Sequence, residues 1–135
     1  MKAERGKDHA LLVPSGATHG IILLAHGSRD PSWQRPVEAV AQRIRQLAPA
    51  TQVCCAYLEA TAPDLPDATA LLAKRGVASI TVLPLFLGMG RHARDDLPIL
   101  MTGLQANHPA IVFDLRPALG EEARMIELMA EIALS

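Results

Sequence analysis

Four short apolar runs alternate with amphipathic stretches along the chain. The runs cover residues 20–25, 53–58, 79–85 and 110–115, and such continuous apolar segments are typical of strands buried on both faces of a parallel sheet. In the stretches between them, apolar residues recur every three or four positions, which places them on one side of a helix. This alternation predicts an α/β fold, with a four-stranded parallel sheet and helices on both faces.

Proline and glycine mark the ends of the first two predicted helices. The first helix carries its apolar positions between Val37 and Ala48 and ends at Pro49. The second helix is predicted over residues 63–74, and Gly76 follows it as the stop.

The last two helices have less distinct beginnings. The third is expected to hold Asp95 and Asp96 in its first turn, where their charges suit the positive end of the helix dipole. A fourth helix is predicted over residues 121–134. Its apolar residues are expected to face the core, and they are Met125, Leu128, Met129 and Ile132.

The length of 135 residues suits one domain. We expect residues 20–135 to form it. Residues 1–19 are mostly polar, with an apolar stretch too short for a secretory signal, and are expected to be a flexible tail on a cytoplasmic protein. His19, at the edge of this tail, is predicted to be a solvated surface residue.

The charge balance excludes several classes of partner. Thirteen basic and fourteen acidic side chains leave a formal net charge of -1, without the basic excess that binding to a nucleic-acid backbone requires. The apolar runs are far shorter than the ~18 residues of a membrane span. We therefore expect neither nucleic acid nor a membrane as partner.

The two cysteines are adjacent, at Cys54 and Cys55. Side chains of successive strand residues point to opposite faces of a sheet, so these thiols are not expected to pair with each other. The chain has no C-x-x-C spacing, and we expect both cysteines to be buried and inert rather than a metal or redox pair.

Chemically active residues follow three of the predicted strands. His26 comes directly after the first strand, Glu59 after the second, and His92 closes the loop after the third. Ligands of open α/β sheets bind beyond the carboxyl ends of the strands, which meet at one edge. The sequence thus predicts a site at this edge.

Two imidazoles and a carboxylate suit late first-row divalent ions such as Co²⁺, Ni²⁺, Zn²⁺ or Fe²⁺, and they are also proton acceptors. The chain lacks the tight ligand spacing of a closed structural zinc site. Any metal bound there is therefore expected to keep open positions, as suits a metal in transit.

Two rival patterns in these loops are weaker. Residues 88–93 match the G-x-G-x-x-A spacing of a dinucleotide-binding loop, and Asp114 ends the next strand. However, an imidazole stands where the backbone should approach a pyrophosphate. His26 and Arg29 also resemble part of a phosphohistidine-type phosphatase motif, but Ala25 stands where those enzymes carry arginine.

Taken together, three segments resemble one family. They are His26-Gly-Ser-Arg-Asp-Pro31, Tyr57-Leu-Glu59, and Pro84-Leu-Phe-Leu-Gly-Met-Gly-Arg-His92 with Asp96-Leu-Pro98 after it. The combination is similar to the short CbiX-type sirohydrochlorin chelatases, the small members of the class II chelatase family. The resemblance extends from Gly20 to the C-terminus.

This resemblance implies a flavodoxin-like half of a chelatase that pairs with a second copy around the active cleft. The implied reaction inserts Co²⁺, or Fe²⁺ or Ni²⁺, into the tetrapyrrole sirohydrochlorin without ATP, in cobalamin or siroheme biosynthesis, and needs no cofactor besides the substrate metal. The positions matching the family's metal-site histidines are His26 and His92, with Glu59 as the accompanying acid.

Further residues of the same loops are predicted to hold the substrate. Guanidinium groups form paired hydrogen bonds with carboxylates, of which sirohydrochlorin has many. The predicted substrate-binding residues are Ser28, Arg29, Leu87, Gly88, Met89, Gly90 and Arg91. Arg94 is a further candidate for pairing with these carboxylates, with a solvated surface role as its alternative, and Leu119 is a candidate for apolar contact with the ring. The two glycines are expected to let the loop bend around a bulky ligand. Trp33 is expected to pack at the start of the first helix.

Two other functions use parts of the same pattern. A non-catalytic metal carrier would use the same histidines and would bind metal without binding a tetrapyrrole. A nucleotide-binding α/β module would bind nucleotide in a way that changes at His26 do not affect. The identity of the metal stays open, because affinity order alone favours whichever ion is available.

Overall fold

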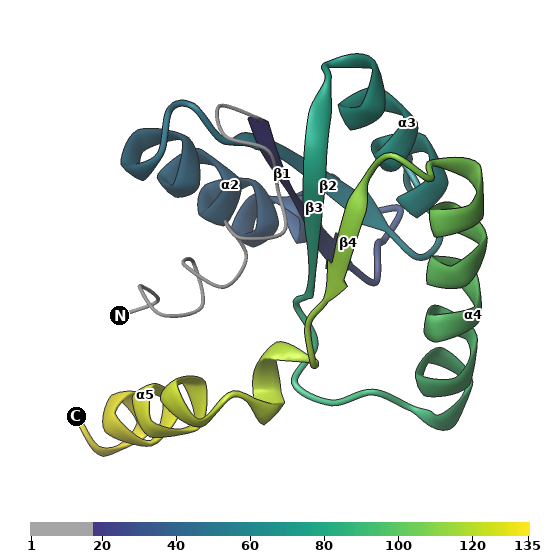
Figure 1. Cartoon of the computed structure of the whole chain (residues 1–135). Coiled ribbons are helices and arrows are strands. Elements are labelled where there is room, and N and C mark those ends of the chain that lie inside the picture. Colours follow the sequence, from purple (N-terminus) through teal and green to yellow (C-terminus); the bar gives the residue numbers. More distant parts are fainter. Residues whose placement is uncertain (1–17) are drawn as a thin grey trace.

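The computed structural model describes residues 18–135, which form a parallel sheet flanked by helices (Figure 1). The strands are β1 (Thr18–Ala25), β2 (Gln52–Tyr57), β3 (Val77–Pro84) and β4 (Val112–Leu115), in the order β2-β1-β3-β4. Every adjacent pair is parallel. The predicted α/β fold and four-stranded parallel sheet are confirmed.

Helices connect the strands and follow the last one. They are α2 (Arg35–Leu47), α3 (Leu65–Lys74), α4 (Arg91–Asn107) and α5 (Ala123–Leu134), with short 3-10 helices η1 (Pro31–Gln34) before α2 and η2 (Leu119–Glu121) before α5. None of the helices within residues 18–135 combines the length and hydrophobicity that crossing a membrane requires.

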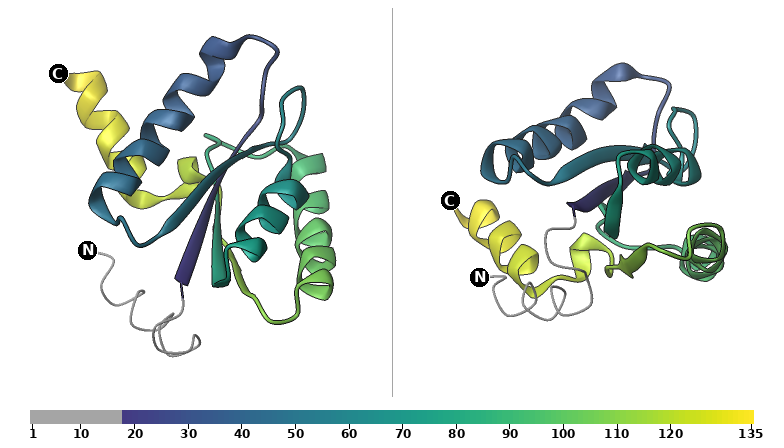
Figure 2. Two further views of the ribbon diagram at one scale, coloured as in Figure 1. Left: turned by 90° about the horizontal axis from the view of Figure 1, so that it is seen from above. Right: turned by 45° about the horizontal axis from the view of Figure 1, so that its top comes forward.

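The two faces of the sheet carry different helices (Figure 2). On one face α3 and α4 enclose a core that includes the fully buried Ile22, Ile80 and Val82. On the other face α2 covers β1 and β2, where Leu23 and Tyr57 are buried. This pattern explains the continuous apolar runs, because a strand covered on both sides needs apolar residues at every position.

Three helices begin at positions other than those predicted. The last begins at Ala123 rather than at residue 121, because residues 119–121 form η2 and Glu122 is the N-cap. The second begins at Leu65 rather than at residue 63, because the Asp64 side chain caps it by accepting a hydrogen bond from the Asp67 backbone N–H at 2.9 Å. The third begins directly after Gly90, whose extended backbone forms its N-cap. Asp95 and Asp96 therefore lie beyond the first turn, and the prediction that they belong to it was wrong.

His19 is not a solvated tail residue. Strand β1 begins at Thr18, and the His19 ring bonds to Ser79 through Nδ1 at 2.6 Å and to Thr81 through Nε2 at 3.1 Å. These partners lie on β3, which is paired with β1 across the sheet. The predicted tail is thus two residues too long, and its remaining residues, 1–17, lie outside those that the structure describes.

The inward orientation predicted for the last helix was also wrong. In α5 no residue is buried, and Leu128 and Ile132 are 46% and 63% exposed. Figure 1 shows α5 leaving the sheet after η2 instead of lying on it. The helical periodicity was correct, but the turn before the helix directs it away from the sheet.

The cysteines behave as predicted. Cys54 belongs to the core under α3 and α4, whereas Cys55 belongs to the core under α2, and neither forms a disulfide. Burial raises the pKa of both thiols, that of Cys55 to about 12. Both thiols are therefore protonated, weak nucleophiles near neutral pH.

Candidate functional site

The loops after β1 and β2 are joined by backbone hydrogen bonds at the carboxyl edge of the sheet. The Leu58 N–H donates to the Ala25 carbonyl at 2.9 Å, and the Glu59 N–H donates to the His26 carbonyl at 3.0 Å. These bonds continue the β1–β2 ladder beyond the sheet. The backbones of His26 and Glu59 are therefore held side by side, as the strand-end argument predicts.

Gly27 is required by this pairing. Its φ is +92°, in the left-handed region that side chains disfavour, and a Cβ there would meet the Glu59 carbonyl oxygen. The chain bends sharply at this position and directs the following residues toward η1. A glycine after the histidine therefore allows the two loops to approach so closely.

The His26 ring packs on an aromatic side chain. Its centroid lies 4.4 Å from that of the Phe86 ring, with the planes tilted by 32°. Phe86 follows β3 and is 3% exposed, whereas His26 is exposed. A buried ring from the third strand thus limits the orientations open to the imidazole while leaving it accessible from solvent.

Ser28 holds the loop that follows His26. Its hydroxyl accepts a hydrogen bond from the Asp30 N–H at 3.0 Å, and its carbonyl accepts one from the Thr61 hydroxyl at 2.5 Å. Asp30 in turn caps η1 by accepting from the N–H and hydroxyl of Ser32, and these bonds lower the pKa of its carboxyl. The loop between β1 and η1 is thus held by its own polar residues together with Thr61 from the loop after β2.

The loop after β3 carries the two glycines of the predicted substrate segment. Neither Gly88 nor Gly90 has a positive φ, and a Cβ at either position would point into open space. The sequence predicted that these glycines let the loop bend sharply, but the backbone at both positions has a conformation that other residues can also adopt. What the glycines provide is free volume in front of the loop.

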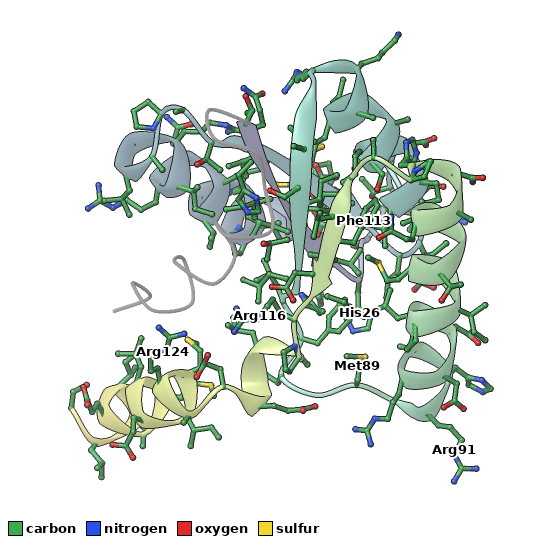
Figure 3. All side chains as sticks on the ribbon, in the orientation of Figure 1. His26, Met89, Arg91, Phe113, Arg116 and Arg124 are labelled. Atoms are coloured by element: carbon green, nitrogen blue, oxygen red, sulfur yellow. The ribbon has the colours of Figure 1, made fainter. Side chains whose placement is uncertain are left out.

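Met89 lies between these glycines and faces the interior. It is half-buried and packs against the core beneath α3 and α4, and Figure 3 shows it below His26. The Arg94 guanidinium donates to the Met89 carbonyl at 3.4 Å. The neighbouring Leu87 side chain is 75% exposed, so an apolar group stands in solvent beside the free volume.

His92 lies in the first turn of α4, and both it and Glu59 are exposed. Within residues 18–135, no three His, Cys, Asp or Glu side chains come together as a metal-binding group. The topology brings His26, Glu59 and His92 to one edge of the sheet without gathering them into a closed ligand set.

The prediction made for Trp33 from the sequence was wrong. Trp33, in η1, is 67% exposed, although it was expected to pack at the start of the first helix. Trp33 is the single tryptophan of the chain and follows His26 by seven residues. This closeness to His26 in the sequence was the one indication that Trp33 lies near the candidate site. The Trp33 indole is thus an exposed apolar side chain on the short helix that follows the loop after β1.

Three arginines of the predicted site are exposed, namely Arg29, Arg91 and Arg94. Figure 3 shows the Arg91 side chain extending outward from the first turn of α4, away from His26. The Arg91 guanidinium and the His26 ring thus do not point toward each other.

The CbiX family profile matches residues 20–134 of this chain. The chain belongs to the CbiX family. The match covers all four strands except the first two residues of β1, together with every loop of the candidate site.

The chain is similar in sequence to a protein from Methanothermobacter thermautotrophicus that is named sirohydrochlorin cobaltochelatase. It is 33% identical to this CbiX chain over 92 residues, which are 66% of this chain and 64% of that protein. The CbiX chain therefore spans less than two thirds of that relative.

Two solved structures share the fold. The CbiX protein from Marinobacter aquaeolei VT8 superposes with a TM-score of 0.73 at 33% identity, over 85% of this chain and 93% of that one. The sirohydrochlorin chelatase SirB from Bacillus subtilis subspecies spizizenii, solved in complex with cobalt, gives a TM-score of 0.70 at 23% identity. The superposition includes 86% of this CbiX chain but only 51% of the SirB chain.

Proposed function

We propose that this protein is a sirohydrochlorin chelatase, which inserts a divalent metal ion into the tetrapyrrole without ATP. Co²⁺ is the first candidate, with Fe²⁺ and Ni²⁺ as alternatives. The observation that carries the proposal is the placement of two exposed histidines after strands β1 and β3, one on a loop and one in the first turn of α4, in a chain of the CbiX family.

Metal insertion needs ligands that exchange and bases that accept protons. Two pyrrole N–H groups must lose their protons while a partly dehydrated cation reaches the face of the macrocycle. Neutral imidazole can do both near neutral pH. His26 and His92 hold the ion through their unprotonated ring nitrogens, and each nitrogen accepts one pyrrole proton once the ion has passed from it to the macrocycle. Both side chains are exposed, which leaves them within reach of a planar substrate.

Glu59 supports this chemistry from the neighbouring loop. Its backbone is bonded to that of His26, so the two residues keep their relative position while the substrate binds. Its carboxylate is exposed and free to add a ligand, to orient a histidine or to pass a proton to solvent.

The macrocycle lies in the space in front of the glycine loop. A side chain at Gly88 or Gly90 would project into that space, and the exposed Leu87 between β3 and these glycines offers apolar contact to the ring. Peripheral carboxylates of the substrate pair with Arg29 and Arg91, whose guanidinium groups are exposed near the same edge.

Two copies of the chain form the working enzyme. One chain brings fewer than three metal-binding side chains together within residues 18–135, and it matches about half of the SirB chain. A homodimer would supply a second sheet edge, and with it further walls and ligands for a substrate held between the copies.

The test is anaerobic insertion of Co²⁺, Fe²⁺ or Ni²⁺ into sirohydrochlorin, followed by the macrocycle absorbance against a protein-free control. We expect His92→Ala to lower the enzymatic rate to the spontaneous level. His108→Ala is the matched control, because His108 follows the opposite end of the same helix α4, and it should keep the wild-type rate.

One outcome would overturn the proposed function, and a second would overturn the role given to His92. Wild-type protein that binds the metal without accelerating insertion for any ion would favour the carrier function instead. A His92→Ala variant with full activity would remove His92 from the mechanism, even if the protein is a chelatase.

A further inference from the structure

Ala60 has a backbone conformation that alanine disfavours. It directly follows Glu59, and its φ of +66° is the only positive φ of a residue other than glycine within residues 18–135. The Thr61 N–H donates to the Glu59 carbonyl at 2.8 Å. This bond closes a γ-turn centred on Ala60, and a positive φ at the central residue gives the rare, strained form of that turn. The chain therefore reverses within one residue directly after a candidate site residue, at a cost in backbone strain.

Hydrogen bonds hold the chain on both sides of Ala60. Before it, the Glu59 N–H donates to the His26 carbonyl at 3.0 Å. After it, the half-buried Thr61 donates its hydroxyl to the Ser28 carbonyl at 2.5 Å. A strained residue persists only where its surroundings fix it, and these two bonds tie both neighbours of Ala60 to the loop after β1. The Thr61 hydroxyl thus supplies one of the bonds that keep Ala60 at positive φ.

The strained turn is not required merely to connect β2 with α3. Glycine adopts a positive φ without a steric penalty. At the other two positive-φ positions within residues 18–135 the chain has glycine, namely Gly27 and Gly76. At Ala60 the residue's own preference opposes the turn. The conformation after Glu59 therefore depends on the Thr61 bond instead of on the residue at the centre of the turn.

Loss of the Thr61 bond would release this strain. The chain would then be held on one side of Ala60 only, and Ala60 would rotate toward negative φ. That rotation changes the direction of the backbone between Glu59 and Thr61. Glu59 adjoins the turn, so its exposed carboxylate would lose its fixed position beside the loop of His26.

We infer that Thr61 is a positioning residue for Glu59. Its hydroxyl holds the strained turn at Ala60 closed, and the turn keeps Glu59 beside His26 while the metal passes to the macrocycle. The inference rests on the chelatase function proposed above and on the role given there to Glu59. Thr61 itself contacts neither metal nor substrate and acts through the backbone of the two residues before it.

Variants at Thr61 test this role. Thr61→Val removes the hydroxyl but keeps the shape of the side chain, so kcat for metal insertion should fall about tenfold while KM for sirohydrochlorin stays within about twofold. Thr61→Ser retains the hydroxyl and should retain kcat. Thr102→Val is the matched control, because the Thr102 hydroxyl on α4 also donates to a backbone carbonyl, that of Pro98, at 3.0 Å. It should keep the wild-type kcat. Wild-type kcat in Thr61→Val would overturn the inference.

A second substitution separates release of strain from a general loss of stability. Ala60→Gly removes the steric preference that opens the turn, so it should change kcat little by itself. In combination with Thr61→Val it should restore most of the kcat that Thr61→Val loses. If the double variant is as slow as Thr61→Val, the strain at Ala60 has no part in the effect and the inference fails.

Amide hydrogen exchange tests the position of Glu59 without the reaction. The Glu59 N–H should exchange about tenfold faster in Thr61→Val than in the wild type, because its bond to the His26 carbonyl opens more often. Thr61→Ser should exchange at the wild-type rate. An unchanged rate in Thr61→Val would contradict the inference even if the wild type is an active chelatase. If the wild type inserts no metal but the exchange rates respond as expected, the proposed function fails and the hold of Thr61 on Glu59 remains supported.

Discussion

The imidazole of His26 rests on the ring of Phe86, with 4.4 Å between the two centroids. The two residues come from loops after different strands, and sequence separates them by sixty positions. One is exposed and the other is 3% exposed, so a residue of the hydrophobic core helps to orient a candidate metal ligand.

We expect Phe86→Leu to slow metal insertion several-fold through loss of this support. Because leucine is smaller than phenylalanine and Phe86 is buried, the substitution should also cost about 1–2 kcal/mol of stability through lost burial and a small cavity. The rate constant for insertion should fall more than the affinity for the tetrapyrrole changes, and the proton signals of the His26 ring should shift in the NMR spectrum as the ring current disappears.

Phe113→Leu is the control for this prediction. Phe113 packs against the same core from β4 and has no ring contact with His26 among the contacts within residues 18–135. Equal loss of activity in both variants would indicate a general effect on the core and would contradict a positioning role for Phe86.

Gly27→Ala should destabilise the protein by about 1–3 kcal/mol, from backbone strain at positive φ together with the clash against the Glu59 carbonyl. Gly76→Ala isolates the first effect, because Gly76 has a φ of +81° but nothing near its Cβ position. We expect a smaller loss there, of about 1 kcal/mol. Urea unfolding of both variants measures the difference, and equal losses would show that the clash contributes nothing.

Gly88→Leu should weaken substrate binding without weakening the fold. A side chain at this position points into open space, so the free energy of unfolding should stay within about 0.5 kcal/mol of wild type. The KM for sirohydrochlorin should rise because the leucine fills the volume proposed for the macrocycle. Gly103→Leu, at an equally open position on α4, serves as control, and an unchanged KM in Gly88→Leu would place the macrocycle elsewhere.

Stability should decline in alkaline solution. Burial raises the pKa of Cys55 from 9.0 to about 12, so above pH 9 the unfolded chain releases a proton that the folded chain retains. The folded state then binds more protons, and the free energy of unfolding falls by up to about 1.4 kcal/mol for each pH unit, with full stability present below pH 9.

Cys55→Ala should reduce this slope. Burial also raises the pKa of Cys54 above 9.0 and that of Tyr57 from 10.0 to about 12, so a smaller decline that begins near pH 9 should remain in the variant. Urea unfolding across the alkaline range gives the slopes. Parallel curves for the variant and the wild type would show that the Cys55 thiol does not titrate differently in the two states.

The residues of the candidate site could be located from sequence because the rule behind them is topological. Apolar runs define strands, parallel strands end at a common edge, and His26 and Glu59 directly follow two such runs. Their backbones are indeed hydrogen-bonded. The exposure of Trp33 could not be predicted, because an indole near a helix start can pack or remain free according to the shape of the surrounding loops.

The sequence by itself determined the order of strands and helices, the parallel sheet and the separation of Cys54 from Cys55, because each of these follows from local periodicity and from steric rules that hold for any chain. Only the tertiary structure decided the position of His19 and the direction of α5. His19 joins the sheet because Ser79 and Thr81 lie opposite it on β3. Helix α5 leaves the sheet because the turn at Gly120 is anchored to the backbone after β3. Both depend on contacts between segments far apart along the chain, which local patterns do not encode.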